Sequence, residues 1–239
     1  LIAYIQHGQL HVTETREAAF EKIVDLWKAD GGHLKEHVKD VFILAPLNCE
    51  VKAINQMCQA ERRRESQLGE TFLTVAGQNI HEGDRVVLTK RDTRLKIENG
   101  FFGEVTSVDP ENQKINLKLD RGDREVSISV PHYGDRIKLG YCSTVHTSQG
   151  STRETVHVLL GGFMMDKHLS YVAASRSKGD THLVCDHRSV EKEPTIQEAI
   201  GTLARAMSRD RTKNLATDLI EQGRNQVTQR HELAHRVSL

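Results

Sequence analysis

Two short polar stretches carry the residue types best suited to contact phosphate groups. Residues 140–152 hold Gln149 and Gly150 among several hydroxyl side chains and an imidazole, and residues 170–178 contain Arg176 near their end. A glycine lets the backbone approach a phosphate closely, and polar side chains can donate hydrogen bonds to its oxygens. An arginine held near a helix end can neutralise phosphate charge across a cleft. We therefore expect both stretches to serve one phosphate-binding site.

Apolar runs and amphipathic helices surround these stretches. The aliphatic runs, typical of buried parallel strands, are residues 41–45, 155–160 and 181–185. Helices are expected at residues 15–30, after a capping Thr15, and at residues 48–64, which Asn48 can cap. Alternating strands and helices predict an α/β domain, in which loops at strand ends carry the chemistry.

The sequence pattern changes between residues 79 and 135. Short strands separated by turn signals such as Asn99-Gly100 are expected here; they are residues 85–89, 103–108, 114–119 and 125–130. This spacing predicts a small β-barrel or sandwich. The chain is then expected to re-enter the parallel sheet through residues 137–145. The predicted domains are residues 1–78 with 136–190, an insertion at residues 79–135, and a helical tail or linker at residues 191–239.

One loop of the predicted insertion combines basic and aromatic residues. The basic residues are Lys90, Arg91, Arg94 and Lys96. Phe101 and Phe102 follow them, and this combination suits the wall of a channel for single-stranded DNA. The alternative is a charged loop over a β-barrel core that contains the two phenylalanines.

The overall composition limits the possible functions. The chain has 239 residues with 33 Lys plus Arg and 33 Asp plus Glu, so any nucleic acid must bind a local basic patch. The four cysteines form no C-x-x-C pair, which favours free thiols in a reducing cytosol. No apolar run approaches the roughly 20 residues of a membrane span. We expect a cytoplasmic protein without a membrane partner. The first residues carry neither an initiator methionine nor a signal-peptide pattern, so we expect a piece of a longer polypeptide.

The two polar stretches resemble motifs of a known family. Residues 144–150 read Thr-Val-His-Thr-Ser-Gln-Gly, and residues 171–176 read Tyr-Val-Ala-Ala-Ser-Arg. In this order they resemble motifs V and VI of superfamily 1 DNA helicases of the RecD-like branch, especially MobF-type conjugative relaxase-helicases. The resemblance covers about residues 1–187. It implies a RecA-like second motor lobe with a small Src-homology-3-like β-barrel insertion, followed by a helical C-terminal tail.

The resemblance also implies roles for individual residues. Arg176 would be the arginine finger, which stabilises charge on the transferred phosphoryl group. Gln149 and Gly150 would lie toward the nucleotide with Arg176, while Thr144 and His146 would contact single-stranded DNA. Many helicases place a nucleotide-contacting arginine near the position of Asn48 and Cys49, so that contact is in doubt here. Lys178 remains open between a phosphate contact and a surface charge.

The chain contains no G-x-x-x-x-G-K-[ST] loop for binding ATP phosphates. Alone it should not hydrolyse ATP. The resemblance implies a first RecA-like lobe of the same polypeptide, which would supply most contacts to ATP and Mg²⁺. The expected function is the C-terminal lobe of an ATP-dependent 5′-to-3′ helicase, joined to a relaxase that nicks plasmid DNA, with single-stranded DNA and conjugation machinery as partners. The alternatives are a helicase without a relaxase, and a catalytically inert module that binds single-stranded DNA or a secretion partner.

Two patterns suggest metals, and we interpret neither as a metal site. Residues 231–235 match H-E-x-x-H, the zinc-binding pattern of metalloproteases, but no third ligand follows and the neighbourhood is polar. Asp186 ends an aliphatic run, as a metal-binding carboxylate often does, but His187 stands where a glutamate is expected. We predict that Asp186 is a strand-end residue and that the chain binds no metal.

Overall fold

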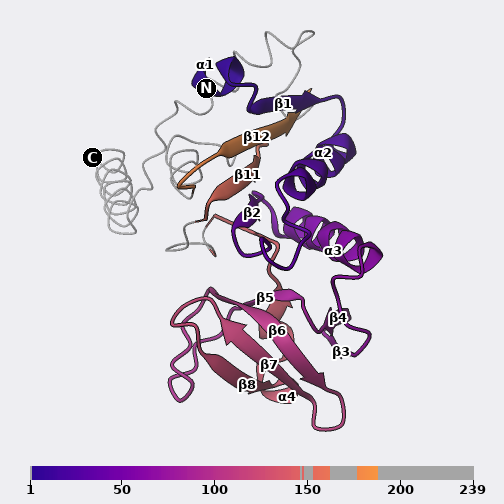
Figure 1. Ribbon diagram of the computed structural model, residues 1–239, viewed down its shortest axis with the longest axis vertical. Helices are drawn as coiled ribbons and strands as arrows, with labels where there is room; N and C mark the ends of the chain where they lie inside the picture. Colours follow the sequence, from indigo (N-terminus) through magenta and orange to yellow (C-terminus); the bar gives the residue numbers. More distant parts are fainter. Residues whose placement is uncertain (1, 146, 148–152, 162–176, 188–239) are drawn as a thin grey trace, which may run out of the picture.

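The computed structural model describes the whole chain except residues 1, 146, 148–152, 162–176 and 188–239. Two sheets, each of five strands, dominate the described part: one is parallel and the other antiparallel. They lie at opposite ends of the molecule's long axis (Figure 1). No described helix is long and apolar enough to cross a membrane.

The parallel sheet confirms the predicted α/β class. Its order is β1-β12-β11-β2-β10, and every pairing is parallel. The strands are β1 (Leu10–Thr13), β2 (Val41–Leu44), β10 (Cys142–Ser143), β11 (Thr155–Leu159) and β12 (Thr181–Asp186). The three aliphatic runs form β2, β11 and β12, as predicted. The edge strand β1 was not expected, because its four residues are all only half-buried and show no apolar run.

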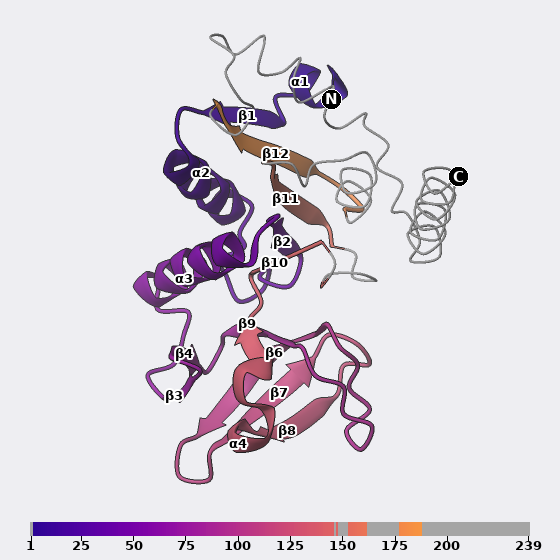
Figure 2. The ribbon, with the colours of Figure 1, turned by 180° about the vertical axis from the view of Figure 1, so that it is seen from behind.

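Two helices cover one face of this sheet (Figures 1 and 2). They are α2 (Arg16–Ala29) and α3 (Asn48–Arg64), and a short α1 (Ile2–Gln6) precedes β1. Thr15 caps α2 as predicted, because its hydroxyl accepts a hydrogen bond from the Ala18 amide at 3.1 Å. The prediction that Asn48 caps α3 is wrong. Leu47 occupies the cap position, and its amide donates to the Glu50 carboxylate at 3.2 Å.

The antiparallel sheet has the order β8-β7-β6-β5-β9. Its strands are β5 (Arg85–Leu88), β6 (Phe101–Asp109), β7 (Lys114–Leu119), β8 (Glu125–Ser129) and β9 (Ile137–Leu139), with α4 (Val130–Tyr133) between the last two. A separate hairpin, β3 (Phe72–Val75) with β4 (Gln78–His81), precedes them. Within the described residues no pairing joins the edge strands β8 and β9 into a barrel, so the Src-homology-3-like barrel and the domain boundaries stay predictions.

Strand β9 corrects the expectation that residues 137–145 re-enter the parallel sheet. Ile137–Leu139 instead pair with β5, and only Cys142–Ser143 join the parallel sheet. The physical reason is burial: Ile137 and Leu139 face the apolar core of the antiparallel sheet while Lys138 faces outward. Figure 2 shows the chain rising from β9 to β10, between the two sheets.

An aromatic pair joins the two sheets. Phe42 of β2 and Phe102 of β6 are both buried, with ring centroids 5.2 Å apart and nearly perpendicular rings. The Arg153 guanidinium lies over both rings, at 5.7 and 5.5 Å from their centroids. Phe102 therefore packs between the sheets and does not line a solvent-exposed channel.

Candidate nucleic-acid interface

Thr144 begins a tight turn directly after β10, at the carboxyl end of the parallel sheet. Its Oγ1 lies 3.0 Å from Oγ1 of Thr147, and the Thr147 amide donates to the same oxygen at 3.3 Å. Both threonines are half-buried. The turn therefore holds two hydroxyl groups next to each other at a strand end, where open α/β sheets bind ligands. We call Thr144 and Thr147 with Val145 the threonine turn.

Asn55 of α3 fixes the strand that leads into this turn. Its side chain is 3% exposed, and its Oδ1 accepts hydrogen bonds from the amides of Tyr141 and Cys142, both at 2.9 Å. Its Nδ2 donates to the Cys142 carbonyl at 2.9 Å. A single amide thus serves three backbone groups of β10 and the residue before it. The Tyr141 hydroxyl is held separately, because it donates to the buried carboxylate of Asp84.

A cleft of about 310 Å³ opens beside the threonine turn, and we call it the threonine cleft. Helix α3, the β3–β4 hairpin and β9 form its walls. Its polar lining includes Asn48, Lys52, Asn55, Lys138, Thr144 and Thr147. Lys52 of α3 and Lys138 of β9 are exposed and bring positive charge from two of these walls, against one carboxylate, Asp135. Hydroxyl groups flanked by lysines suit the phosphates of a nucleic-acid backbone.

A second cleft, of about 530 Å³, lies against the antiparallel sheet, and we call it the basic-loop cleft. Residues 91–95 form one wall, while the end of β8 and helix α4 form the other. Its polar lining includes Arg91, Arg94, Ser127, Ser129, His132 and Tyr133. The structure therefore brings two of the four predicted basic residues, Arg91 and Arg94, to one cleft with an exposed histidine.

Internal contacts order the loop that carries the basic residues. Lys90 donates to the His132 carbonyl at 2.9 Å, and Arg91 Nε lies 3.3 Å from the Glu98 carboxylate. The Lys96 carbonyl accepts from Arg124 at 2.7 Å. The Leu95 amide, and then the Tyr133 hydroxyl, hydrogen-bond the carboxylate of Asp92 and hold its pKa below the usual range. These contacts hold the loop in a defined conformation, although the Glu98 carboxylate offsets part of its positive charge.

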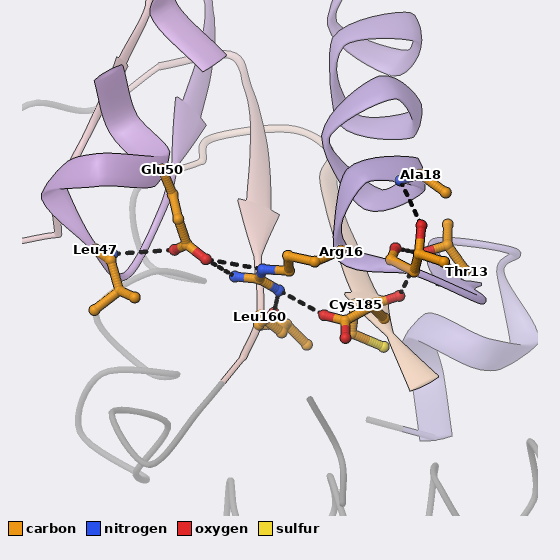
Figure 3. A network of polar contacts seen from close by, with 9 residues as sticks. Thr13, Arg16, Ala18, Leu47, Glu50, Leu160 and Cys185 are labelled. Atoms are coloured by element: carbon orange, nitrogen blue, oxygen red, sulfur yellow. Dashed lines mark hydrogen bonds and ion pairs between the residues drawn. The ribbon is translucent and has the colours of Figure 1, made fainter. Parts of the chain in front are cut away.

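A polar network that the sequence did not reveal occupies the carboxyl ends of the other parallel strands (Figure 3). Arg16 Nε and Nη2 donate to one Glu50 carboxylate oxygen at 2.8 and 2.6 Å. Its Nη1 donates to the Leu160 carbonyl at 2.5 Å and to the Asp186 carboxylate at 3.0 Å. The arginine joins α2, α3, β11 and β12. No local pattern could reveal it, because its partners lie 34 and 170 residues away in the sequence.

Among the described residues this network has a structural role, because one guanidinium shared by two carboxylates ties α2 to α3 and to the end of β12. Asp186, which is 2% exposed, ends β12 as a strand-end residue, as predicted. The network also explains Gly161, because a Cβ there would lie 2.6 Å from Arg16 Nη1.

The three predicted nucleotide-contacting residues, Gln149, Gly150 and Arg176, lie outside the described residues. The predicted DNA contact His146 and residues 231–235 with the H-E-x-x-H pattern also lie outside them. Next to the gaps, Arg153 and Ser177 form a parallel bridge, and the Lys178 amide donates to the Arg153 carbonyl at 2.8 Å. The Lys178 side chain is 65% exposed and lies 3.8 Å from the Glu154 carboxylate.

The described residues contain no cluster of three or more metal-ligating side chains. Cys49 is exposed and Cys58, Cys142 and Cys185 are buried, and all four are free thiols, as expected. Burial raises the pKa of the Cys185 thiol to about 12, so it stays protonated at neutral pH.

Comparison with known proteins gives a consistent set of relatives. No protein-family model matches the chain. It is 29% identical over 221 residues to conjugal transfer protein TraA of Agrobacterium fabrum (strain C58), and 28% identical over 220 residues to the probable conjugal transfer protein TraA of Sinorhizobium fredii (strain NBRC 101917 / NGR234). These alignments cover 91% and 90% of this chain but 19% of each relative. The chain thus spans about a fifth of the length of its curated relatives.

Solved structures of Pif1 helicases are also similar. The Bacteroides Pif1 helicase in complex with ADP-AlF3 and single-stranded DNA matches 90% of this chain and 55% of that chain, with 15% identity and a TM-score of 0.42. Pif1 from Candida albicans matches 70% of this chain and 49% of that chain, with 15% identity and a TM-score of 0.41. This likeness is too distant to carry a functional argument.

The chain is therefore an α/β protein with a parallel sheet. Over most of its length it is homologous to the conjugal transfer protein TraA.

Proposed function

We propose that this chain is the second motor lobe of an ATP-dependent DNA helicase and that it binds single-stranded DNA through the threonine cleft. The homology to conjugal transfer proteins supports a parent that acts in conjugal transfer. In our proposal this parent also carries a relaxase that nicks plasmid DNA, and it unwinds DNA in the 5′-to-3′ direction. In that parent ATP and Mg²⁺ would bind mainly to a first RecA-like lobe, and the conjugation machinery would be a further partner.

One observation carries the DNA-binding part of the proposal: Thr144 lines the same cleft as Lys52 and Lys138. The hydroxyl can donate to a phosphate oxygen, while the two lysines supply charge from both walls. The basic-loop cleft extends this surface, because Thr89 lines the first cleft and Arg91 the second, two positions apart in the sequence. A strand of several nucleotides could contact both clefts.

The ATP-linked part of the proposal is supported by the bridge between Arg153 and Ser177. Arg153 follows the motif V-like stretch, and Ser177 follows Arg176 directly. The two motif-bearing stretches thus rejoin the described structure side by side. We propose that Arg176 is an arginine finger, with Gln149 and Gly150 near the nucleotide and His146 beside Thr144 on DNA.

Fluorescence anisotropy of a labelled single-stranded oligonucleotide tests the DNA-binding proposal. We expect the affinity to fall as the salt concentration rises, because bound phosphates release counterions. Lys52→Ala should weaken binding and reduce the salt slope by about one, since it removes one phosphate contact. Lys114→Ala is the matched control, because this exposed lysine of β7 lines neither cleft. Equal effects of both substitutions would contradict the assigned cleft.

ATP hydrolysis separates a motor lobe from an inert binding module. In the longer polypeptide that we propose to contain this chain, Arg176→Ala should lower DNA-stimulated kcat by a factor on the order of 10³ or more. Oligonucleotide affinity should change little. Full hydrolysis by the variant would refute the arginine finger, and absence of hydrolysis in the unaltered polypeptide would favour the inert module.

A further inference from the structure

The turn that ends the basic loop presses against the threonine turn. Gly100 has a positive φ of 84°, and its amide donates to the Leu88 carbonyl at 2.8 Å. A Cβ built on Gly100 would lie 2.7 Å from the backbone carbonyl oxygen of Thr147. Real Cβ atoms essentially never approach an atom this closely, and the neighbour is backbone, so a larger residue must displace the turn.

This contact links two elements that come from different sheets. Gly100 belongs to the connection between β5 and β6 that also carries Lys90, Arg91, Arg94 and Lys96. Thr147 belongs to the turn that follows β10 of the parallel sheet. Since Thr147 donates its amide to Thr144 Oγ1, a shift of Thr147 changes the geometry of the Thr144 hydroxyl.

The other side of the threonine turn is already held in place. Asn55 binds the backbone of Tyr141 and Cys142, three and two residues before Thr144. The turn therefore lies between a strand anchored by α3 and a glycine of the β5–β6 connection. A displacement of Thr147 cannot be passed back to β10 without breaking the buried hydrogen bonds of Asn55, so it alters the distance between Thr147 and Thr144.

We infer that Gly100 is a positioning residue for single-stranded DNA: its missing side chain lets the β5–β6 connection set the geometry of the threonine turn. The inference rests on the proposed DNA-binding function. The β5–β6 connection would then couple the basic-loop cleft to the threonine turn, because it forms one wall of that cleft and also contacts Thr147 through Gly100. The ligand class is a phosphate-bearing single strand that contacts both clefts.

Gly100→Ala in the full chain tests the inference, with Gly122→Ala as the matched control. Both glycines have a positive φ, 84° and 78°, so alanine strains both backbones similarly, but Gly122 has nothing within 4 Å of its would-be Cβ. Hydrogen exchange of peptides covering residues 141–147 is the first measurement. We expect faster exchange at the Thr147 amide in Gly100→Ala only, because its hydrogen bond to Thr144 is disturbed.

Gly100→Asn with Gly122→Asn provides a second pair if the alanine variant folds poorly. Asparagine tolerates positive φ better than alanine does, yet it adds the same Cβ, so steric contact is separated from backbone strain. Circular dichroism confirms that each variant is folded before the other measurements are compared.

Oligonucleotide anisotropy is the second measurement. Gly100 variants should bind a single strand about tenfold more weakly, the equivalent of one lost contact, while Gly122 variants bind like wild type. Unchanged exchange at residues 141–147 would overturn the inferred contact. Altered exchange with wild-type affinity would overturn its role in DNA binding. If the wild-type chain bound no single strand even at low salt, the proposed DNA-binding function would fail while the exchange result still reported on the contact.

Discussion

At the scale of single residues, one buried amide decides where the threonine turn lies. Asn55→Ala should lower the free energy of unfolding by roughly 3 kcal/mol, because two amides and a carbonyl of β10 and its neighbour would lose their buried partner. Denaturant unfolding measures this loss. Asn112→Ala is the control: its side chain bonds Asp109 on the exposed surface, so we expect a change within about 0.5 kcal/mol. Similar losses in both variants would contradict the role of Asn55.

Arg16 is the second residue whose role depends on geometry. Arg16→Lys keeps the charge, but one ammonium cannot serve Glu50, the Leu160 carbonyl and Asp186 together. Because Asp186 is nearly fully buried, we expect a loss of roughly 2 kcal/mol in unfolding free energy, measured by denaturant titration. Arg64→Lys at the exposed end of α3 should cost about 0.5 kcal/mol or less. A stable Arg16→Lys variant would show that the network is dispensable.

At the scale of elements, a row of histidines crosses three neighbouring strands. His11 of β1, His182 of β12 and His157 of β11 lie on the face covered by α2, with ring centroids 5.7 and 5.2 Å apart. Burial, and then the positive charge of Lys22, lowers the pKa of His11 to about 4. Burial also lowers the pKa of His157, although Asp30 at 3.0 Å opposes this shift.

This row makes stability depend on pH. In the unfolded chain the side chain of His11 takes up a proton near pH 6.5, whereas in the folded chain it takes one up only near pH 4. The folded state therefore has its full stability above about pH 6.5. It loses stability as the pH falls toward 4, because protonation of His11 then favours the unfolded state. We expect Tm to fall between pH 7 and pH 4.5, and to fall less steeply in His11→Gln. An identical pH slope for this variant would exclude His11, and His132→Gln on the exposed surface serves as the control.

At the scale of the whole molecule, an ion triad holds the two sheets together. Asp120, in the turn after β7, accepts from Arg85 of β5 at 2.5 Å and from Arg153, next to β11, at 2.7 Å. Burial opposes ionisation of Asp120, but the two guanidinium groups outweigh it and keep its pKa low. Together with the Phe42–Phe102 pair, this triad connects the antiparallel sheet to the parallel sheet.

Removing the charge of Asp120 should loosen this junction. Asp120→Asn should lower the unfolding free energy by about 2–4 kcal/mol, because two largely buried guanidinium groups lose their counter-charge. Limited proteolysis should show earlier cleavage between the sheets. Asp123→Asn, in the same turn but highly exposed, should behave like wild type. A variant of Asp120 with wild-type stability would contradict a role for this triad in joining the sheets.

Much of the fold could be predicted because local signals agree with it. The aliphatic runs that became β2, β11 and β12 are buried on both faces of a parallel sheet, so each reads as a continuous apolar segment. Thr15 capped α2 where the apolar stripe begins, and β7 matched its alternating pattern residue for residue. Strand β9 could not be assigned correctly, because three residues with buried ends fit either sheet, and only pairing with β5 decides between them.

The candidate site also combines features that local sequence patterns determine with features that depend on tertiary contacts. The sequence by itself determined the α/β class and the phosphate-suited residue types, since these follow from local composition, period and spacing. Thr144 as a candidate DNA contact followed from the motif resemblance. Only the tertiary structure decided that Thr144 shares a cleft with Lys52 and Lys138, that Arg16 pairs with two distant carboxylates, and that Gly100 touches Thr147. Apart from Lys138, which lies close to Thr144 in the sequence, these contacts join residues 34 to 170 positions apart. Their geometry comes from packing between elements, which no local pattern encodes.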